Sequence, residues 1–403
     1  MVEGSRLILP SIMPEAEAER RPGYTWSMSD AGFSTPRPAQ LRRFGRVFYP
    51  AGLRMQKALA AHVSQEGNPD QLVMLEHDPV FTLGRNATPA DIHMSDDFLA
   101  AQGVSVHRTD RGGEVTYHGP GQIVAYPICN LRGGREDVGR LVRGLEEAMI
   151  RTAADFGVAA DRLKGAPGIW VETPRGLEKL GAIGLHLSRW ITTHGIAFNV
   201  RPNLDHFRWI TPCGFTDKGV CSLLSLLGEA APTWEAAADR LQAHLTACLA
   251  LDLQPVRQPS RSVSAMTWRR GADGPEILMM LRVPEHGLWW QSVTGMMEPG
   301  ETPEQTAHRE LMEETGLAGT LRPLGLSHSF WVDPSIVRFP DAEPRFNTET
   351  CFSMEVPAEA PVRLEPKEHS EFRWCGPEEA LALMKWEGSK AALRCLQGWW
   401  AGA

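Results

Sequence analysis

The chain has 403 residues and the composition of an ordinary globular protein, enough for two or three domains that each bury a core. Its 41 basic and 49 acidic residues give a net charge of −8, which does not favour non-specific attraction to nucleic acid. Apolar runs are too short for a membrane span or an export signal, so we expect a cytoplasmic protein without nucleic acid or membrane as partner.

The seven cysteines are scattered through the chain, and no two form a CxxC pair. An odd number without paired spacing indicates neither a disulfide framework nor a zinc site.

Four segments follow one another along the chain. Residues 1–38 carry Pro, Ser and charged residues without periodicity and are expected to be a loosely ordered leader. Residues 39–253 show a mixed α/β pattern. Residues 254–263, rich in Gln, Arg, Ser and Pro, are expected to link this domain to a last domain over residues 264–403.

Regular elements can be placed within the first domain. Residues 71–76, 80–83 and 122–128 are strand-like apolar runs. Apolar residues at helical spacing from Val138 onward predict a helix that stops at Gly157, and a last amphipathic helix is predicted after Thr233.

A glycine-rich stretch at residues 111–121 surrounds Arg111, Tyr117 and His118. Its four glycines and one proline give a backbone that can approach a ligand closely. The alternative is a glycine-rich hairpin with an incidental histidine.

Lys179 enters a strand of small residues at 177–184, and a second such run follows at 193–200. Small residues leave room for a chain-like ligand. The alternative is that Lys179 is a solvated charge at a sheet edge.

Cys213 lies in a turn at residues 211–214. Most lone cysteines are inert and buried, and a reactive one needs a partner that stabilises its thiolate. The ammonium of Lys179 could do this, although the sequence does not show that the two meet.

In their order along the chain and in their residues, these three motifs resemble those of the lipoyl(octanoyl) transferase family, over roughly residues 42–251. The resemblance implies a biotin- and lipoate-ligase-like mixed-sheet fold. It implies transfer of octanoate from octanoyl-acyl carrier protein to a lysine of lipoyl domains, those of 2-oxoacid dehydrogenases and the glycine cleavage H protein. Cys213 would carry the acyl thioester, Lys179 would lower its pKa, and no cofactor would be needed.

The same resemblance implies which residues line the acyl and carrier-arm site. They are Arg111, Gly112, Gly113, Glu114, Val115, Thr116, Tyr117, His118, Ala182, Ile183, Gly184, Gly195, Ile196 and Ala197. The alternatives are an ATP-dependent lipoate ligase or lipoyl amidotransferase, and a non-catalytic module that binds lipoyl domains.

In the last domain, residues 295–317 read GMMEPGETPEQTAHRELMEETGL. Thr302 is the expected N-cap of a helix, Pro303 suits its first position, Gln305 completes a capping box and Gly316 ends it. Glu310, Glu313 and Glu314 then lie on one helical face, where Mg²⁺ or Mn²⁺ would offset their repulsion. The alternative is a solvated acidic helix.

This stretch resembles the Nudix box, and the resemblance covers roughly residues 264–398. It implies an α/β/α sandwich that hydrolyses a nucleoside diphosphate linked to another group. Glu313 and Glu314 would bind the metal, and Glu310 would bind metal or activate water. Gly295, Glu301 and Arg309 would support them.

Residues 290–295, 347–350, 368–369 and 372–374 are similar to the dihydroneopterin triphosphate pyrophosphatases. That similarity adds Glu368 to the expected metal ligands and suggests a nucleotide or pterin triphosphate as substrate. The sequence therefore predicts a fusion of two enzymes.

Overall fold

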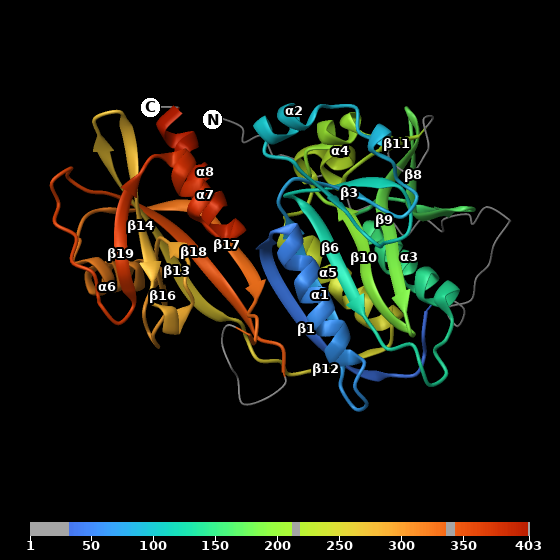
Figure 1. Ribbon diagram of the computed structural model, residues 1–403. Helices are drawn as coiled ribbons and strands as arrows, with labels where there is room; N and C mark the ends of the chain where they lie inside the picture. The colour runs from blue at the N-terminus through green and yellow to red at the C-terminus, as the bar shows by residue number, and fades with distance from the viewer. Residues whose placement is uncertain (1–31, 212–217, 336–342, 402–403) are drawn as a thin grey trace, which may run out of the picture.

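The computed structural model describes residues 32–211, 218–335 and 343–401, arranged as two α/β domains (Figure 1). Most of the expected leader, residues 1–31, and the turn that contains Cys213 lie outside the described residues.

The first domain is built on a mixed sheet with the strand order β12-β1-β2-β6-β10-β9-β8-β7, and β11 pairs in parallel with β9. The strands are β1 (Arg37–Val47), β2 (Asp70–His77), β6 (Gln122–Ile128), β7 (Asp161–Leu163), β8 (Ala166–Thr173), β9 (Gly176–Ser188), β10 (Ile191–Asn199), β11 (Gly219–Val220) and β12 (Leu251–Gln254).

Helices cover both faces of this sheet. Helices α3 (Val138–Asp155) and α5 (Trp234–Cys248) pack on one face, and α1 (Tyr49–Val63) packs on the other. Asp137 caps α3 and Thr233 caps α5 through side-chain hydrogen bonds. The strands and helices predicted from local patterns are therefore confirmed.

A three-stranded sheet, in the order β4-β3-β5, carries the glycine-rich stretch. Its strands are β3 (Val80–Leu83), β4 (Ser105–Arg108) and β5 (Val115–His118). Their buried residues share a core with helix α2 (Asp96–Ala101) and the 3₁₀ segment η2 (Leu204–Trp209). Short elements η1 (Pro89–Asp91), α4 (Leu223–Leu227) and η4 (Gly228–Ala230) complete the domain.

Part of the expected leader contacts this domain. Phe33 is buried, and its N–H donates a 2.9 Å hydrogen bond to the carbonyl oxygen of Cys248. Strand β1 already begins at Arg37. From residue 32 onward the chain is thus part of the packed domain.

The C-terminal domain is an α/β/α sandwich, as predicted. Its sheet has the order β15-β14-β13-β18-β17, with β16 paired to β13 and β19 to β14. Helix α6 (Pro303–Thr315) packs on one face, and α7 (Pro377–Leu383) and α8 (Glu387–Ala401) on the other. The remaining bounds are β13 (Ser260–Gly271), β14 (Gly274–Arg282), η5 (Pro284–His286), β15 (Trp290–Gln291), β16 (Val293–Met296), β17 (Leu321–Trp331), β18 (Phe346–Glu355) and β19 (His369–Cys375).

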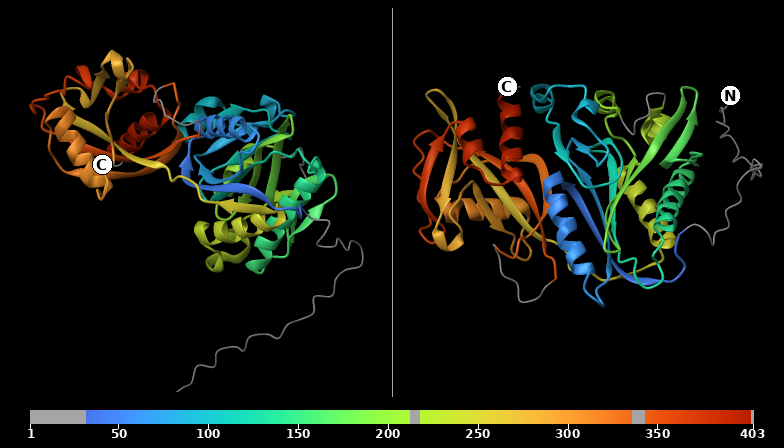
Figure 2. Two further views of the ribbon diagram at one scale, coloured as in Figure 1. Left: turned by 90° about the horizontal axis from the view of Figure 1, so that it is seen from below. Right: turned by 45° about the vertical axis from the view of Figure 1, so that its right-hand side comes forward.

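The two domains are in contact along β1 and α1 (Figures 1 and 2). The ring of Phe44 lies 5.2 Å from that of Phe346, and Phe48 lies 5.1 Å from His328. Arg42 pairs with Glu343 at 3.4 Å. Because these side chains come from both domains, the β17–β18 hairpin is anchored on the first sheet.

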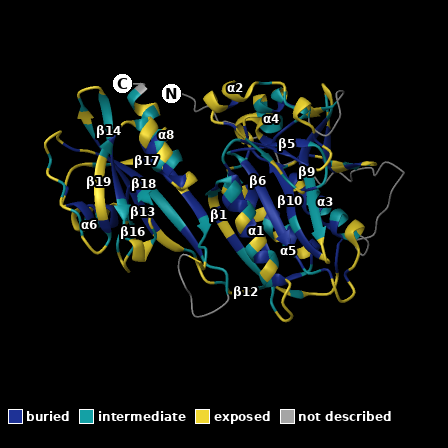
Figure 3. Cartoon of the chain, viewed as in Figure 1, coloured by how far each residue is buried: buried dark blue, intermediate teal, exposed yellow. Residues whose placement is uncertain are grey.

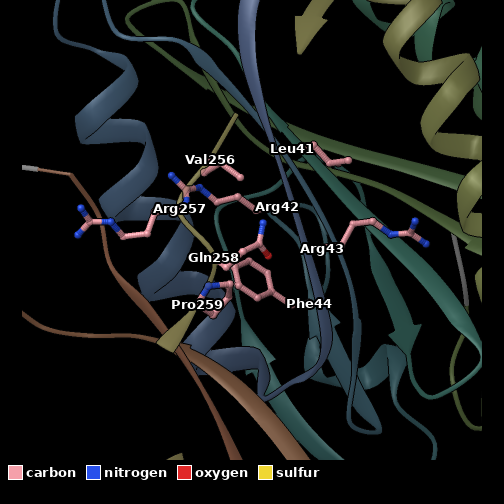
Figure 4. A pocket seen from close by; sticks show the side chains of 8 residues that line it. All are labelled: Leu41, Arg42, Arg43, Phe44, Val256, Arg257, Gln258 and Pro259. Carbon is pink, nitrogen blue, oxygen red and sulfur yellow. The ribbon is translucent and has the colours of Figure 1, made fainter. Parts of the chain in front are cut away.

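Central strands of both sheets are buried, and exposed residues gather on the outer helical surfaces (Figure 3). A small pocket forms where the connection after β12 passes β1, lined by residues 41–44 and 256–259 (Figure 4). It lies on the connecting segment and contains none of the predicted site residues.

Candidate active sites

A floor of small residues lies on the α1 face of the first sheet. Ala182 pairs with Ala197, and Gly184 pairs with Gly195, across β9 and β10. Between them, Ile183 and Ile196 pack into the core under α3 and α5. Because side chains alternate along a strand, the small residues face the opposite side. The side chains of Ile183 and Ile196 therefore do not line this floor.

Lys179 lies near the end of this floor on β9. It is buried, and its Nζ is 4.6 Å from the centroid of the Trp170 ring. Val220 of β11 pairs with Lys179, and the N–H of Cys221 donates to the Lys179 carbonyl oxygen at 3.0 Å. Lys179 is therefore not the solvated edge charge of the alternative interpretation.

The glycine-rich stretch docks onto β9. The N–H of Gly112 donates to the carbonyl oxygen of Leu185 at 2.9 Å. Arg111 is buried and its Nε donates to Thr82 Oγ1 at 3.0 Å. A Cβ on Gly184 would lie 3.2 Å from Arg111 Cδ, so a small residue is needed at this approach.

The side chains of the other glycine-stretch residues have several environments. Val115 and Tyr117 are core residues of the small sheet, and Thr116 pairs with Thr82. The backbones of Gly113 and Glu114 accept hydrogen bonds from Asn86 and Gly84. Most of this stretch thus shapes the site through its backbone.

His118 is buried and belongs to a hydrogen-bonded network. Its Nδ1 is 2.7 Å from Gln122 Oε1, and Gln122 Nε2 donates to Asn199 Oδ1 at 2.9 Å. Since the amide oxygen of Gln122 accepts, His118 Nδ1 carries the proton and Nε2 keeps its lone pair. Burial, reinforced by the nearby His77, lowers the pKa of His118 to about 3. The imidazole is therefore neutral near pH 7.

In the C-terminal domain, α6 begins and ends as predicted. The Thr302 hydroxyl accepts from the Gln305 N–H at 3.3 Å, and the Gln305 side chain accepts from the Thr302 N–H at 2.8 Å. Gly316 ends the helix in a left-handed conformation with φ of 68°. Local capping thus fixes the helix on which the carboxylates lie.

Arg309 gathers the acidic residues at one side of α6. It makes a bidentate pair with Glu301 at 2.8 and 3.0 Å, and the hydrogen bonds from Arg309 lower the pKa of Glu301 to about 2. Its Nη1 donates to Glu310 at 2.8 Å and to Glu313 at 3.2 Å. This guanidinium orients the carboxylates.

Glu310 and Glu314 are the less exposed carboxylates of α6. Burial raises the pKa of both. A Cβ at Gly295 would overlap the Glu310 carboxyl group, so the glycine makes a cradle for it. Glu314 contacts the buried His369 at 2.8 Å. Hard oxygen donors held in this way fit Mg²⁺ or Mn²⁺.

Glu368 is more exposed than these residues. It lies 3.3 Å from Arg282 and 3.9 Å from His286, and it raises the pKa of Glu314 through like charge. It therefore stands beside the α6 carboxylates, on the segment that leads into β19.

Comparison with known proteins matches each domain to a family. Residues 49–246 match the lipoyl protein ligase A/B catalytic domain, and residues 259–395 match the NUDIX domain. The chain is 39% identical to an octanoyltransferase of Myxococcus xanthus over 356 residues, which cover 87% of this chain and 97% of that one. The chain belongs to the octanoyltransferase family.

Other octanoyltransferases and two solved structures are also similar. An octanoyltransferase of Chloroflexus aggregans is 49% identical over 53% of this chain and 94% of its own. A lipoate protein ligase of Thermoplasma acidophilum has a TM-score of 0.44 and 16% identity, covering 55% of this chain and 87% of that one. The E. coli dihydroneopterin triphosphate pyrophosphohydrolase has a TM-score of 0.30 and 27% identity, covering 33% and 91%.

This octanoyltransferase is an acyltransferase with a second, Nudix hydrolase domain. No helix within the described residues is long and apolar enough to cross a membrane.

Two buried polar residues near His118 were not among the residues predicted from the sequence, His77 and Tyr126. His77 Nδ1 is 2.6 Å from the Val47 carbonyl oxygen, and its Nε2 is 2.5 Å from the Tyr126 hydroxyl. Burial lowers the pKa of His77 to about 4. Strand alternation could have placed Tyr126 on the α1 face, because it occurs in a predicted strand, whereas His77 follows the predicted strand 71–76 and belongs to β2 only in the structure.

Proposed function

We propose that the transferase domain moves octanoate from octanoyl-acyl carrier protein to a lysine of lipoyl domains through a thioester on Cys213. The supporting observation is the pairing of β11 with β9. It holds residues 219 and 220, which follow the cysteine turn in sequence, against β9 beside the buried residue Lys179. The small residues of β9 and β10 leave a floor for an eight-carbon chain.

The proposed chemistry is two acyl transfers. The Cys213 thiolate attacks the carrier thioester, its carbon–sulfur bond to the carrier breaks, and the carrier leaves as a thiol after taking a proton. The lysine amine of the lipoyl domain then attacks the enzyme thioester, forms the amide, loses a proton and releases Cys213. The Lys179 ammonium stabilises the thiolate at both stages.

Intact-protein mass after incubation with octanoyl-acyl carrier protein tests this proposal. We expect an octanoyl adduct on the wild type that a lipoyl domain discharges, and none on Cys213→Ala. Cys221→Ala is the matched control, because burial raises the pKa of that thiol to about 12. Octanoylation of the lipoyl domain by Cys213→Ala, dependent on added ATP, would favour a ligase instead.

We also propose that the Nudix domain is a pyrophosphohydrolase of a heteroaromatic triphosphate such as dihydroneopterin triphosphate. Glu310, Glu313 and Glu314, with Glu368 nearby, would hold Mg²⁺ or Mn²⁺. The metal neutralises phosphate charge when bound. Arg309 keeps the carboxylates in place, and Glu310 is the candidate either to bind metal or to take a proton from the attacking water.

Product analysis with dihydroneopterin triphosphate and with common nucleoside triphosphates, with and without Mg²⁺, tests this function. We expect metal-dependent pyrophosphate release that Glu314→Gln abolishes. Glu304→Gln, on the exposed first turn of α6, should retain activity. Equal hydrolysis by the wild type and Glu314→Gln would contradict the assignment.

A further inference from the structure

His194 lies within strand β10 but has a backbone conformation that is foreign to strands. Its φ is 58°, in the left-handed region that residues other than glycine rarely adopt. The residue is also buried, with 4% of its surface exposed. Such backbone strain persists only where surrounding contacts hold it, and it gathers at functional sites. Neither the predicted site residues nor the proposed acyl transfers include His194.

The pairing of β10 with β6 breaks at this residue. The ladder between these strands begins at the pair of Ile196 with Ala125. In the same register His194 would oppose Pro127, which has no N–H to donate. The N–H of His194 donates instead to the Gln56 side-chain oxygen of α1, at 2.6 Å. The backbone of His194 is therefore held by helix α1 and not by the neighbouring strand.

The imidazole of His194 is directed to a carboxylate. Regular alternation would send it toward the α3 and α5 core, as it sends Ile196. Its Nε2 donates instead to Asp110 at 2.9 Å, and the other oxygen of Asp110 lies 3.7 Å from His186 Nε2. His186 is two residues beyond Gly184 on β9, and so on the floor face. Two histidines from neighbouring strands thus hold one carboxylate, an arrangement that we call the Asp110 clamp.

The clamped carboxylate directly precedes the glycine-rich stretch. Strand β8 pairs with β9 no further than Ala182. Beyond that residue the edge of β9 receives the glycine-rich stretch, where the Gly112 N–H donates to the Leu185 carbonyl oxygen at 2.9 Å. Arg111 then lies over Gly184, since a Cβ there would be 3.2 Å from Arg111 Cδ. The clamp therefore acts where the stretch meets the floor.

The floor itself is open on the side of Lys179. Ala182 has strand neighbours on both sides, in β8 and β10, and it still keeps accessible surface. An acyl chain that lies along the floor from Lys179 would pass Ala182 and reach the Arg111 side chain above Gly184. The guanidinium of Arg111 is bound to Thr82, and the clamp fixes the residue before its backbone. The far end of the floor is thus closed.

We propose that His194 is a positioning residue of octanoyl transfer: through Asp110 it holds the glycine-rich stretch against β9, so that Arg111 limits the length of the acyl chain. The proposal rests on the proposed acyl site between Lys179 and the small residues. An octanoyl chain ends before Arg111, whereas a longer chain has to displace the stretch. The strained backbone of His194 is then maintained for chain-length selection.

Octanoyl- and dodecanoyl-acyl carrier protein are the donors that test this role, with the full chain as enzyme and a lipoyl domain as acceptor. We expect the wild type to favour octanoyl transfer about tenfold or more in kcat/KM, the scale of methylenes that do not fit a site. Asp110→Ala opens the clamp at its exposed member, whose side chain is 64% accessible, so the fold is kept. We expect this variant to lose most of the preference.

His194→Gly opens the clamp from the other side. It also relieves the backbone strain, because glycine adopts a positive φ without a steric penalty. We expect the same loss of preference as in Asp110→Ala and no further loss in the double variant, since both changes break one contact. Arg189→Gly is the matched control: Arg189 has a φ of 50° in the exposed turn between β9 and β10. It should keep the wild-type preference.

The ratio of the two rates separates the clamp from general stability, because a loss of folded protein lowers both rates together. A wild type that transfers neither acyl group contradicts the proposed acyl transfer and the clamp with it. A wild type that transfers both groups equally well overturns the limit set by Arg111. With the wild-type preference in place, an unchanged ratio in Asp110→Ala and His194→Gly overturns the clamp. Losses that multiply in the double variant also overturn it, because His194 and Asp110 would then act separately.

Discussion

Asn199 donates a hydrogen bond of 3.0 Å from its side-chain amide to the backbone carbonyl oxygen of Cys221. The same side chain accepts from Gln122, which in turn holds His118. The backbone N–H of Cys221 donates a hydrogen bond to the backbone carbonyl oxygen of Lys179. These hydrogen bonds therefore join β5, β6, β9 and β10 through Cys221, the residue that follows β11.

Loss of the Asn199 donor should impair acyl transfer. Asn199→Asp keeps the size of the side chain but replaces its N–H groups with an acceptor that faces the Cys221 carbonyl oxygen. Losing a buried partner costs about 1–3 kcal/mol of stability. We expect the octanoyl-transfer rate to fall about tenfold or more, because β11 no longer holds its position beside Lys179.

Transfer rate and the free energy of unfolding are measured together for this variant. Asn68→Asp, outside the transferase network at the end of α1, is the control. An Asn199→Asp protein with normal transfer would show that the network does not position the site.

The stability of the transferase domain should fall in acid because His118 is buried in its neutral form. Its pKa is about 3 in the fold, against 6.5 in the unfolded chain. As pH falls below 6.5, the unfolded chain binds protons that the folded chain excludes, so the free energy of unfolding decreases. Chemical unfolding at several pH values between 6.5 and 4.5 measures this slope.

We expect the free energy of unfolding of His118→Asn to decrease less steeply as pH falls, because asparagine has no group that the unfolded chain could protonate at this position. His308→Asn, exposed on α6, should keep the wild-type slope. Identical slopes for the wild type and His118→Asn would mean that His118 is protonated in the folded protein.

Local patterns in the sequence were sufficient for many of the helices and strands that carry the candidate site residues. Capping at Thr302 and Gly316 fixed α6, because those signals act within a few residues. The floor at Ala182 and Gly184 was predicted as a small-residue strand. The side chain of Ile183 packs toward the core on the other face, because a one-residue step along a strand reverses the face.

Contacts between distant segments could not be read from these patterns. His77 meets Tyr126 across 49 positions, and Glu314 meets His369 across 55. Such pairs depend on strand order, which no local signal specifies. The packing of Phe48 against His328 depends on how two domains dock, so the sequence alone left it open.

Arg309 should be irreplaceable by lysine in the Nudix domain. Its guanidinium bonds Glu301 through two nitrogens and reaches Glu310 with a third. A lysine ammonium lacks this planar fork. We expect Arg309→Lys to lower pyrophosphate release at least tenfold, about 1.4 kcal/mol of barrier, and to leave octanoyl transfer unchanged.

Arg270→Lys is the matched control, because Arg270 makes an exposed pair with Glu355 and lies away from α6. An equal loss in both variants would indicate general destabilisation. Retention of hydrolysis in Arg309→Lys would show that charge alone suffices at this position.

Gly295→Ala should disable the hydrolase through Glu310. A methyl group at this position would occupy the space of the Glu310 carboxyl group, so the carboxylate has to leave its cradle. Whether Glu310 binds metal or activates water, its displacement removes it from the reaction. We expect pyrophosphate release to fall about a hundredfold, the scale of losing one positioned catalytic group.

Gly376→Ala provides the comparison, because a Cβ there meets no atom within 4 Å and its φ of −60° suits alanine. If the loss in Gly295→Ala comes from Glu310, then adding Glu310→Gln to it should cause little further decrease, since two changes at one contact are not additive. If the rate losses of the two single variants instead multiply in the double variant, the loss in Gly295→Ala does not come from Glu310. The added methyl group would then act on the substrate directly.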